Sequence, residues 1–369
     1  MTIVAHSHPF VIGVDTHAKT HTYAVVQTTS GQLLGTEEFP TTPQGIARAM
    51  SWSGRLTGGD AATLWAIEGI ATYGARLARA AAESGYAVVE APRMNAKTRH
   101  GVGKSDPLDA RAIATAVLPV EEDRLCRPRA DDGTRQALRV LVAARDQMAS
   151  EKTMNINALI ALLRANELGI DARKPLIMDQ IGQVSRWHHR TEPLALATAR
   201  HEAIRLAHRI LDLHHALGEN YARLTELITA SPAAPLLEET GVGAYTAAVI
   251  LTAWSHPGRV RNEAAFASLA GVNPIPASSG NTTRHRLNRG GDRRLNRALH
   301  FVAITRMSRD PATKAYVAKR VGEGRTRSEI RRCIKRYVAR HLYRTLNVLY
   351  DDALGTVHAS DSALAPTIG

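Results

Sequence analysis

The N-terminal segment alternates apolar and β-branched positions with polar ones in short runs. Such runs occupy residues 10–16, 21–28 and 32–39. This pattern is typical of strands, and the Thr-Ser-Gly sequence at residues 29–31 is a turn signal. The segment therefore predicts a three-stranded antiparallel meander.

Two later apolar runs, residues 64–68 and 86–91, predict further strands. Helical patterns precede them, at residues 43–52 and in the alanine-rich residues 73–84. We expect an α/β domain with the order strand, strand, strand, helix, strand, helix, strand.

Glycine and proline become rarer between residues 131 and 229, and apolar residues recur there at helical spacing. The repeating positions are Leu138, Leu141, Val142, Met148, Leu159, Leu162, Leu163, Leu206, Ile210, Leu213, Leu217, Leu224 and Leu227. They predict long antiparallel helices, either as a coiled-coil arm or as an ordinary helical bundle.

A Ser-Pro-Ala-Ala-Pro linker at residues 231–235 predicts the start of another domain. The expected divisions are residues 1–130 for the α/β domain, 131–230 for the helical middle and 231–350 for a mostly helical C-terminal domain. Residues 351–369 are small and polar, which predicts a disordered tail.

Net charge points to a polyanionic partner, because the chain of 369 residues carries a formal charge of +13. Residues 255–345 hold 21 Lys and Arg against 5 Asp and Glu, about +16, whereas the remainder is near −3. Nucleic-acid binding is therefore expected in the C-terminal domain.

The two cysteines, Cys126 and Cys333, lack the spacing of a zinc site or a disulfide framework. No basic N-terminal region precedes a long apolar segment, and no window reaches the length of a membrane span. We expect a cytoplasmic protein with no membrane contact. Thr98 stands where a P-loop ending at residues 103–105 would need glycine, so no nucleotide cofactor is expected.

Four acids form the candidate catalytic site. Asp15 lies near the end of the first predicted strand, Glu68 closes the fourth, and Asp106 and Asp109 stand beside Pro107. Carboxylates beside apolar strands need pairing, hydration or a metal, and oxygen ligands suit Mg²⁺ or Mn²⁺.

Three of the acids also have a structural explanation. Asp15 can cap a turn, Asp106 can be the N-cap of a helix with Pro107 as its first residue, and Asp109 can favour the helix dipole. The helix explanation is compatible with metal binding. The order of elements with these acids matches the ribonuclease H-like fold in its resolvase (RuvC-like) form.

Residues 239–248, which include Gly241, Gly243 and Thr246, resemble the hairpin of a helix-hairpin-helix motif. In that motif glycines allow backbone amides to approach a phosphate. A tight turn between two helices is the alternative.

The sequence Ser278-Ser279-Gly280 precedes an arginine cluster, in which a hydroxyl nucleophile could meet a phosphate. An ordinary loop is the alternative for the Ser-Ser-Gly sequence. The cluster comprises Arg284, Arg286, Arg289, Arg293, Arg294 and Arg297. A basic helix, either following a nucleic-acid backbone or facing solvent, is predicted over residues 325–344, with Arg331, Arg332, Lys335 and Arg336.

Taken together, these motifs resemble the DEDD transposases of the insertion-sequence one-ten family, relatives of the Piv site-specific invertase. The resemblance rests on Asp15, Glu68, the Lys-Ser-Asp-x-x-Asp-Ala box at residues 104–110, and two C-terminal boxes at residues 241–247 and 271–280. It covers residues 10 to 350 approximately.

The resemblance implies a RuvC-like domain with Asp15, Glu68, Asp106 and Asp109 on magnesium, and a transposase domain with Ser279 as nucleophile. Ser278 is the nearest rival. It further implies a phosphoserine link to DNA, guidance by a bridge RNA, and a homodimer or homotetramer. The other function classes are a hydrolytic Holliday-junction resolvase, which would not need Ser279, and a non-catalytic nucleic-acid-binding protein, which would tolerate loss of Asp15.

Overall fold

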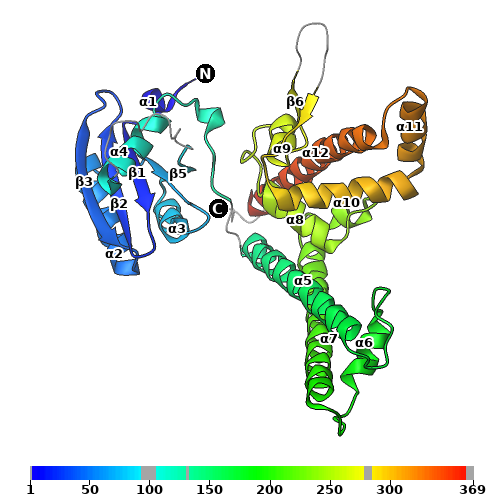
Figure 1. Ribbon diagram of the computed structural model, residues 1–369. Helices are drawn as coiled ribbons and strands as arrows, with labels where there is room; N and C mark the ends of the chain where they lie inside the picture. Colours follow the sequence, from blue (N-terminus) through cyan, green and yellow to red (C-terminus); the bar gives the residue numbers. More distant parts are fainter. Residues whose placement is uncertain (1, 93–104, 130–132, 278–284, 363–369) are drawn as a thin grey trace, which may run out of the picture. The chain divides into compact units, whose positions relative to one another are not determined.

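The computed structural model describes residues 2–92, 105–129, 133–277 and 285–362. The chain forms two compact units (Figure 1). Unit 1 contains Met1–Asp131 and Trp254–Phe266, and unit 2 contains Asp132–Ala253 and Ala267–Gly369. The N-terminal unit is built on a sheet, and the remainder of the described chain is mostly helical.

Unit 1 is organised on a five-stranded sheet in the order β3-β2-β1-β4-β5. The central strand β1 pairs antiparallel with β2 and parallel with β4, and β4 pairs parallel with β5. The predicted meander and both later strands are confirmed to within one residue at most ends. The strands are β1 (Phe10–Thr16), β2 (Thr20–Gln27), β3 (Leu33–Pro40), β4 (Leu64–Ile67) and β5 (Ala87–Glu90).

Helices cover both faces of this sheet. Ile12, Val14 and Ile67 pack with side chains of α2 and α3 on one face. Val11 and Ala66 pack with α4 on the other. The helices of unit 1 are α1 (Val4–Ser7), α2 (Pro43–Thr57), α3 (Ala75–Glu83), α4 (Asp106–Val117) and the 3-10 turn η2 (Glu122–Arg124).

The contact between α4 and β1 is unusually close because residue 13 is glycine. A Cβ on Gly13 would lie 2.2 Å from the carbonyl oxygen of Ala110 and 2.5 Å from the amide nitrogen of Ala114. Both neighbours are backbone atoms, so the helix itself would have to move. Gly13 therefore fixes how closely α4 approaches the central strand.

The start of α4 differs from the predicted one by one residue. Ser105, not Asp106, is the N-cap, and its carbonyl accepts the first helical hydrogen bond, from the Asp109 N–H at 3.0 Å. Pro107 is then the second helical residue. Proline is tolerated there because that N–H also has no partner within the helix, so proline alone does not define the cap.

Unit 2 contains two long helices that run antiparallel, as predicted. Arg145 donates to the Leu217 carbonyl at 2.8 Å, and Asn220 donates to the Leu141 carbonyl at 3.0 Å. The helices in this part are α5 (Thr134–Ala165), α6 (Met178–Ser185) and α7 (Leu194–Thr229). A shared core fills the space between them, with Leu159, Ile181 and Ile210 fully buried.

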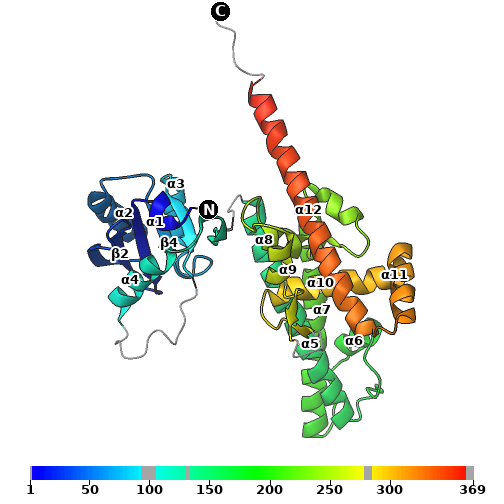
Figure 2. The ribbon, with the colours of Figure 1, turned by 90° about the horizontal axis from the view of Figure 1, so that it is seen from above.

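The C-terminal half of unit 2 is built from helices with one short hairpin. Figure 2 shows α12 beside α10 and α11. The helix α12 continues to Ser362, through part of the segment for which the sequence predicted disorder. The remaining elements are η3 (Ala234–Glu238), α8 (Ala244–Trp254), α9 (Glu263–Leu269), β6 (Pro274–Pro276), β7 (His285–Leu287), α10 (Arg293–Arg309), α11 (Pro311–Gly322) and α12 (Arg327–Ser362).

Within the described residues, none of the helices is both long enough and apolar enough to cross a membrane.

Replacing Gly13 by valine should destabilise unit 1 by about 3 kcal/mol, because the new side chain overlaps the α4 backbone. Chemical denaturation followed by circular dichroism measures this loss. Gly54→Ala is the matched control, since a Cβ at this helical glycine meets nothing within 4 Å. The control should gain about 0.5–1 kcal/mol. Equal stability of the Gly13→Val variant and the wild type would show that α4 is not held by this contact.

Candidate metal centre and nucleic-acid surface

The carboxyl ends of two parallel strands bring Asp15 and Glu68 to the same edge of the sheet. Val14 of β1 pairs with Ile67 of β4, and the Glu68 N–H donates to the Val14 carbonyl at 3.0 Å. The Thr16 hydroxyl donates to the Glu68 carbonyl at 2.9 Å. The residues on both sides of Asp15 are therefore hydrogen-bonded to the backbone of Glu68, which fixes the two acids relative to each other.

The first turn of α4 supplies Asp106 and Asp109. Alternate residues of a strand point to the same face, so Asp15 shares the face of β1 that Gly13 turns toward α4. The close approach at Gly13 consequently places the beginning of α4 near the Asp15 carboxylate. The alternation of β1 and the start of α4 thus bring the Asp15 and Asp106 carboxylates to the same place.

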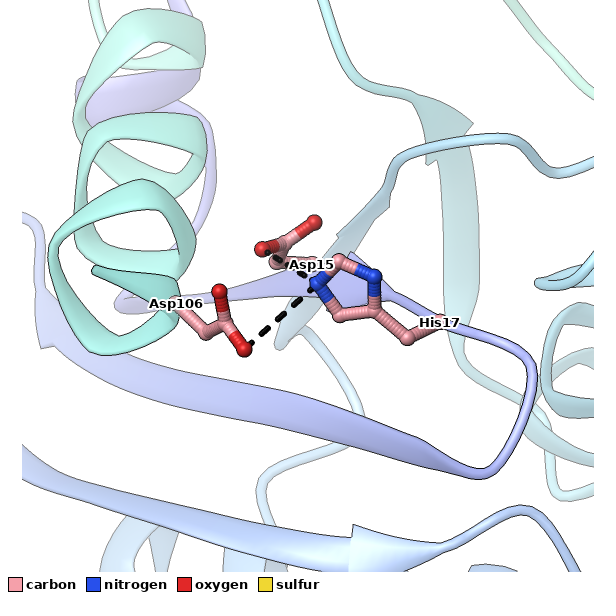
Figure 3. A group of neighbouring side chains, drawn as sticks. All are labelled: Asp15, His17 and Asp106. Carbon is pink, nitrogen blue, oxygen red and sulfur yellow. Dashed lines mark ion pairs between the residues drawn. The ribbon is translucent and has the colours of Figure 1, made fainter. Parts of the chain in front are cut away.

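Asp15, His17 and Asp106 form a compact group (Figure 3). The Nε2 atom of His17 lies 3.3 Å from an Asp15 oxygen and 3.6 Å from an Asp106 oxygen. One ligand atom from each residue lies within 4.8 Å of the others. Side-chain exposure is 10% for Asp15, 45% for Asp106 and 51% for His17, so the group opens to solvent on one side.

The electrostatics of this group favour a bound cation. Burial raises the pKa of the Asp15 carboxyl above its ordinary value, and the charges of Asp106 and Asp109 raise it further, whereas His17 opposes the rise. A cation beside the carboxylates would offset the repulsion between them. Two carboxylates with an imidazole are ligands that fit a divalent metal ion.

Glu68 and Asp109 lie outside the group of three in the part of the chain that the structure describes. Glu68 is exposed, while Asp109 is half-buried and contributes its charge to the Asp15 site. Their roles as metal ligands remain predictions.

Sequence reasoning missed His17 and Glu90. The Asp-x-His spacing at the end of a strand is the signal that could have found His17, which directly follows β1 and lies two residues after Asp15. Glu90 ends β5, and burial raises the pKa of its carboxyl, which accepts hydrogen bonds from the Ile70 and Gly69 amides. Its charge also interacts with Glu68. The acid that closes a short apolar run is the same signal that identified Glu68, but the strand predicted over residues 86–91 extended past Glu90 and concealed it.

In unit 2, the predicted hairpin glycines have packing roles. Gly241 has a φ of +87°. A Cβ there would lie 3.0 Å from the Thr305 Cβ and 3.1 Å from the Val302 carbonyl oxygen of α10. Gly243 directly precedes α8, in which Thr246 lies. Phosphate binding by this turn remains a prediction beside the tight-turn alternative.

Two of the predicted DNA-binding arginines pair with a carboxylate of the chain itself. Arg294 donates to Asp146 at 2.6 Å and Arg297 donates to the other Asp146 oxygen at 2.7 Å. The Tyr245 hydroxyl also donates to Asp146, at 2.6 Å. These two guanidinium groups are thus held in place by α5.

Arg297 also lies with other predicted arginines around the start of α10. A pocket there is lined by Arg289, Arg293, Arg297 and His300 among others. Lys335 of α12 donates to Asn296 in the same pocket wall at 2.6 Å. Burial lowers the pKa of the Lys335 ammonium, and the charge of Arg331 lowers it further.

The remaining predicted residues vary in exposure. Arg331 is half-buried, whereas Arg286, Arg332 and Arg336 are exposed. Ser278, Ser279 and Arg284 lie outside the described residues, in the segment that joins β6 to β7.

Comparison with known proteins gives matches to both halves of the chain. A family profile described as "Transposase" matches residues 12–166, and one described as "Transposase IS116/IS110/IS902 family" matches residues 233–318. A protein of Streptomyces coelicolor named "Insertion element IS110 uncharacterized 43.6 kDa protein" is similar to this chain. It is 26% identical over 272 residues, which cover 62% of this chain and 67% of that protein.

Asp15→Asn and Asp106→Asn should each weaken Mn²⁺ binding at least tenfold, because each removes a charged oxygen ligand from a small cluster. Isothermal titration calorimetry on the whole chain measures the affinity. Glu38→Gln, an exposed acid on β3, is the control and should bind Mn²⁺ as the wild type does. Unchanged affinity in both aspartate variants would exclude a metal centre at this edge.

Asp146→Asn should lower stability at neutral pH by about 1 kcal/mol, because the pair is partly exposed and screened by solvent. Burial alone raises the pKa of the Asp146 carboxyl, but bonds from Tyr245 and Arg294 outweigh it, so the pKa lies below 3.8. The stabilisation is therefore fully present above about pH 4 and is lost as pH falls through the folded pKa.

Urea denaturation of the Asp146→Asn variant and the wild type at pH 7 and pH 3 measures this difference. Glu226→Gln, which breaks an exposed pair with Arg223, should change stability little at either pH. A stability difference between Asp146→Asn and the wild type that persists unchanged at pH 3 would contradict the electrostatic explanation.

Proposed function

Because the chain belongs to the IS110 family of transposases, the insertion-sequence one-ten family, we propose that it uses Asp15, Glu68, Asp106 and Asp109 on magnesium together with Ser279. Membership of this family makes the chain an enzyme that cleaves DNA and transfers strands, and implies use of a divalent metal ion. DNA is accordingly its substrate.

The meeting of Asp15 and Asp106 at the open end of the central strand carries this proposal. A divalent ion held by these carboxylates would polarise a scissile phosphate and offset its negative charge. Asp109 and Glu68, from the same sheet edge and helix start, would complete the set of acids. His17 lies between the two carboxylates and would keep them oriented.

Ser279 would act as the nucleophile. Its Oγ bonds to phosphorus while the bond from phosphorus to the 3′ oxygen breaks, and the proton lost by the serine is balanced by protonation of that leaving oxygen. The products are a free 3′-hydroxyl and a 5′-phosphate linked to the serine. In the second step a 3′-hydroxyl attacks this phosphoserine, joins a new strand and restores the serine.

The same proposal includes the fold of each domain, the RNA partner and the oligomeric state. A sheet with three antiparallel strands followed by two parallel ones, in the order β3-β2-β1-β4-β5, supports a ribonuclease H-like (RuvC-like) domain. The helix-hairpin-helix interpretation of residues 239–248 and the coiled-coil interpretation of α5 and α7 belong to this proposal. Guidance by a bridge RNA and action as a homodimer or homotetramer rest on the family resemblance.

A DNA cleavage assay with Mg²⁺, the candidate RNA and labelled DNA tests the serine step. Wild type and Ser278→Ala should form DNA covalently attached to protein, visible as a slow band on a denaturing gel. Ser279→Ala should form no adduct and lose strand cleavage by at least 1000-fold, because the nucleophile is absent. Asp15→Asn should lose both as well.

Three outcomes oppose the proposal in different ways. Cleavage by Ser279→Ala without an adduct would favour a hydrolytic resolvase that uses water with the same acids. An adduct lost in Ser278→Ala but kept in Ser279→Ala would identify Ser278 as the nucleophile. Recombination by Asp15→Asn at the wild-type rate would remove the acids from the mechanism.

A further inference from the structure

A separate cavity of about 570 Å³ lies where α10, α11 and α12 meet. Tyr316 of α11 lines it together with Tyr337, Arg340, His341 and Arg344 of α12 and Arg306 of α10. None of these side chains belongs to the group of Asp15, His17 and Asp106, and none lies in the segment that contains Ser278 and Ser279. The size of the cavity is within the range of small-ligand sites.

The aromatic wall of this cavity is open to solvent. Tyr337 is 58% exposed although it lies in the middle of a long helix. Its ring meets Tyr316 edge to face, with centroids 6.2 Å apart and planes at 90°. An edge-to-face pair leaves ring surface uncovered, on which a planar group can stack.

The charged wall favours an anion. Glu239 engages two of the lining side chains, since Arg306 donates to one of its oxygens at 2.6 Å and the Nε2 atom of His341 lies 2.7 Å from the other. Arg340 and Arg344 lie one helical turn apart on α12, on the side that lines the cavity.

The acidic lining residue, Asp310, is already engaged. Its carboxylate caps α11 by accepting from the Thr313 amide at 2.7 Å and the Thr313 hydroxyl at 2.5 Å. Glu239 offsets the charge of Arg306, and the charges of Arg340 and Arg344 together exceed the single negative charge of Asp310.

We propose that this cavity binds an unpaired nucleotide of a single-stranded nucleic acid, with the base against Tyr337 and a phosphate near Arg340 and Arg344. Stacking on tyrosine with phosphate binding by arginine is the usual chemistry for unpaired nucleotides. A base inside a duplex is paired and stacked between its neighbours, so its face is not available to Tyr337 and duplex DNA would contact only the charges. The proposal depends on the chain handling nucleic acid, but it does not depend on the metal ion or on Ser279.

Fluorescence anisotropy of the whole chain in EDTA tests the proposal without cleavage. The probes are one labelled eight-nucleotide sequence as single-stranded RNA, as single-stranded DNA and as duplex DNA. Tyr337→Leu should weaken single-strand binding about 5- to 100-fold, the range expected for one stacked base, and leave duplex binding unchanged within about twofold. Tyr337→Phe should bind like the wild type, because the ring is kept.

Matched controls separate stacking from general effects. Tyr73→Leu removes an equally exposed tyrosine of unit 1 and should have no effect. Arg344→Gln should weaken single-strand binding more than Arg309→Gln, an exposed arginine outside the cavity lining. Loss with RNA alone would assign the strand to RNA, loss with DNA alone to DNA, and loss with both would show stacking that ignores the sugar.

Photo-cross-linking of the wild type with 5-iodouridine in the single strand gives a readout that needs no variant. The cross-link should map to the peptide that contains Tyr337 or Tyr316. Wild-type affinity in Tyr337→Leu, equal loss for single strand and duplex, or cross-links that avoid both tyrosines would each overturn the proposal. The cleavage assays of Ser279→Ala and Asp15→Asn test the catalytic proposal separately, and their outcome does not change the binding predicted for Tyr337.

Discussion

The contact between Gly13 and the backbone of α4 is the constraint on which the candidate metal centre depends. Only a residue without a Cβ lets the Ala110 carbonyl and Ala114 amide approach the central strand so closely. Because Asp15 is on the same strand face and Asp106 begins the same helix, this contact sets the separation of the two carboxylates. The acids of the site come from three places in the sequence, and packing at one glycine brings two of them together.

The two units use charge in opposite ways. Unit 1 concentrates carboxylates at one sheet edge, where burial and mutual repulsion raise the pKa of Asp15. The C-terminal part of unit 2 carries the basic excess, yet its arginines are not simply exposed. Asp146 and Glu239 hold Arg294, Arg297 and Arg306 in fixed positions. Such pairing orients guanidinium groups in advance, which lowers the entropy lost when a phosphate binds.

The sequence predicted the sheet well because its strands are short runs rich in apolar and β-branched residues, bounded by turn signals, and the acids at the ends of β1 and β4 were found where those runs close. The start of α4 was wrong by one residue, since proline is compatible with either of the first two helical positions. The partners of Arg294 and Arg297 could not be predicted, because Asp146 is about 150 residues away in the sequence. His17 was overlooked beside a carboxylate two residues earlier, and Glu90 was overlooked because the predicted strand extended to residue 91. The cavity with Tyr337 depends on how three helices pack, which spacing within one helix does not determine.

The central claim is that Asp15 and Asp106 bind one divalent ion. Anomalous diffraction from crystals of the whole chain grown with Mn²⁺ tests it most directly, because manganese is located independently of the protein density. The account predicts an anomalous peak at about 2.2 Å from an oxygen of each carboxylate, the distance expected for such ligands. The contradicting result is a peak elsewhere on the chain at saturating Mn²⁺, with no metal between Asp15 and Asp106 and only His17 in contact with both carboxylates.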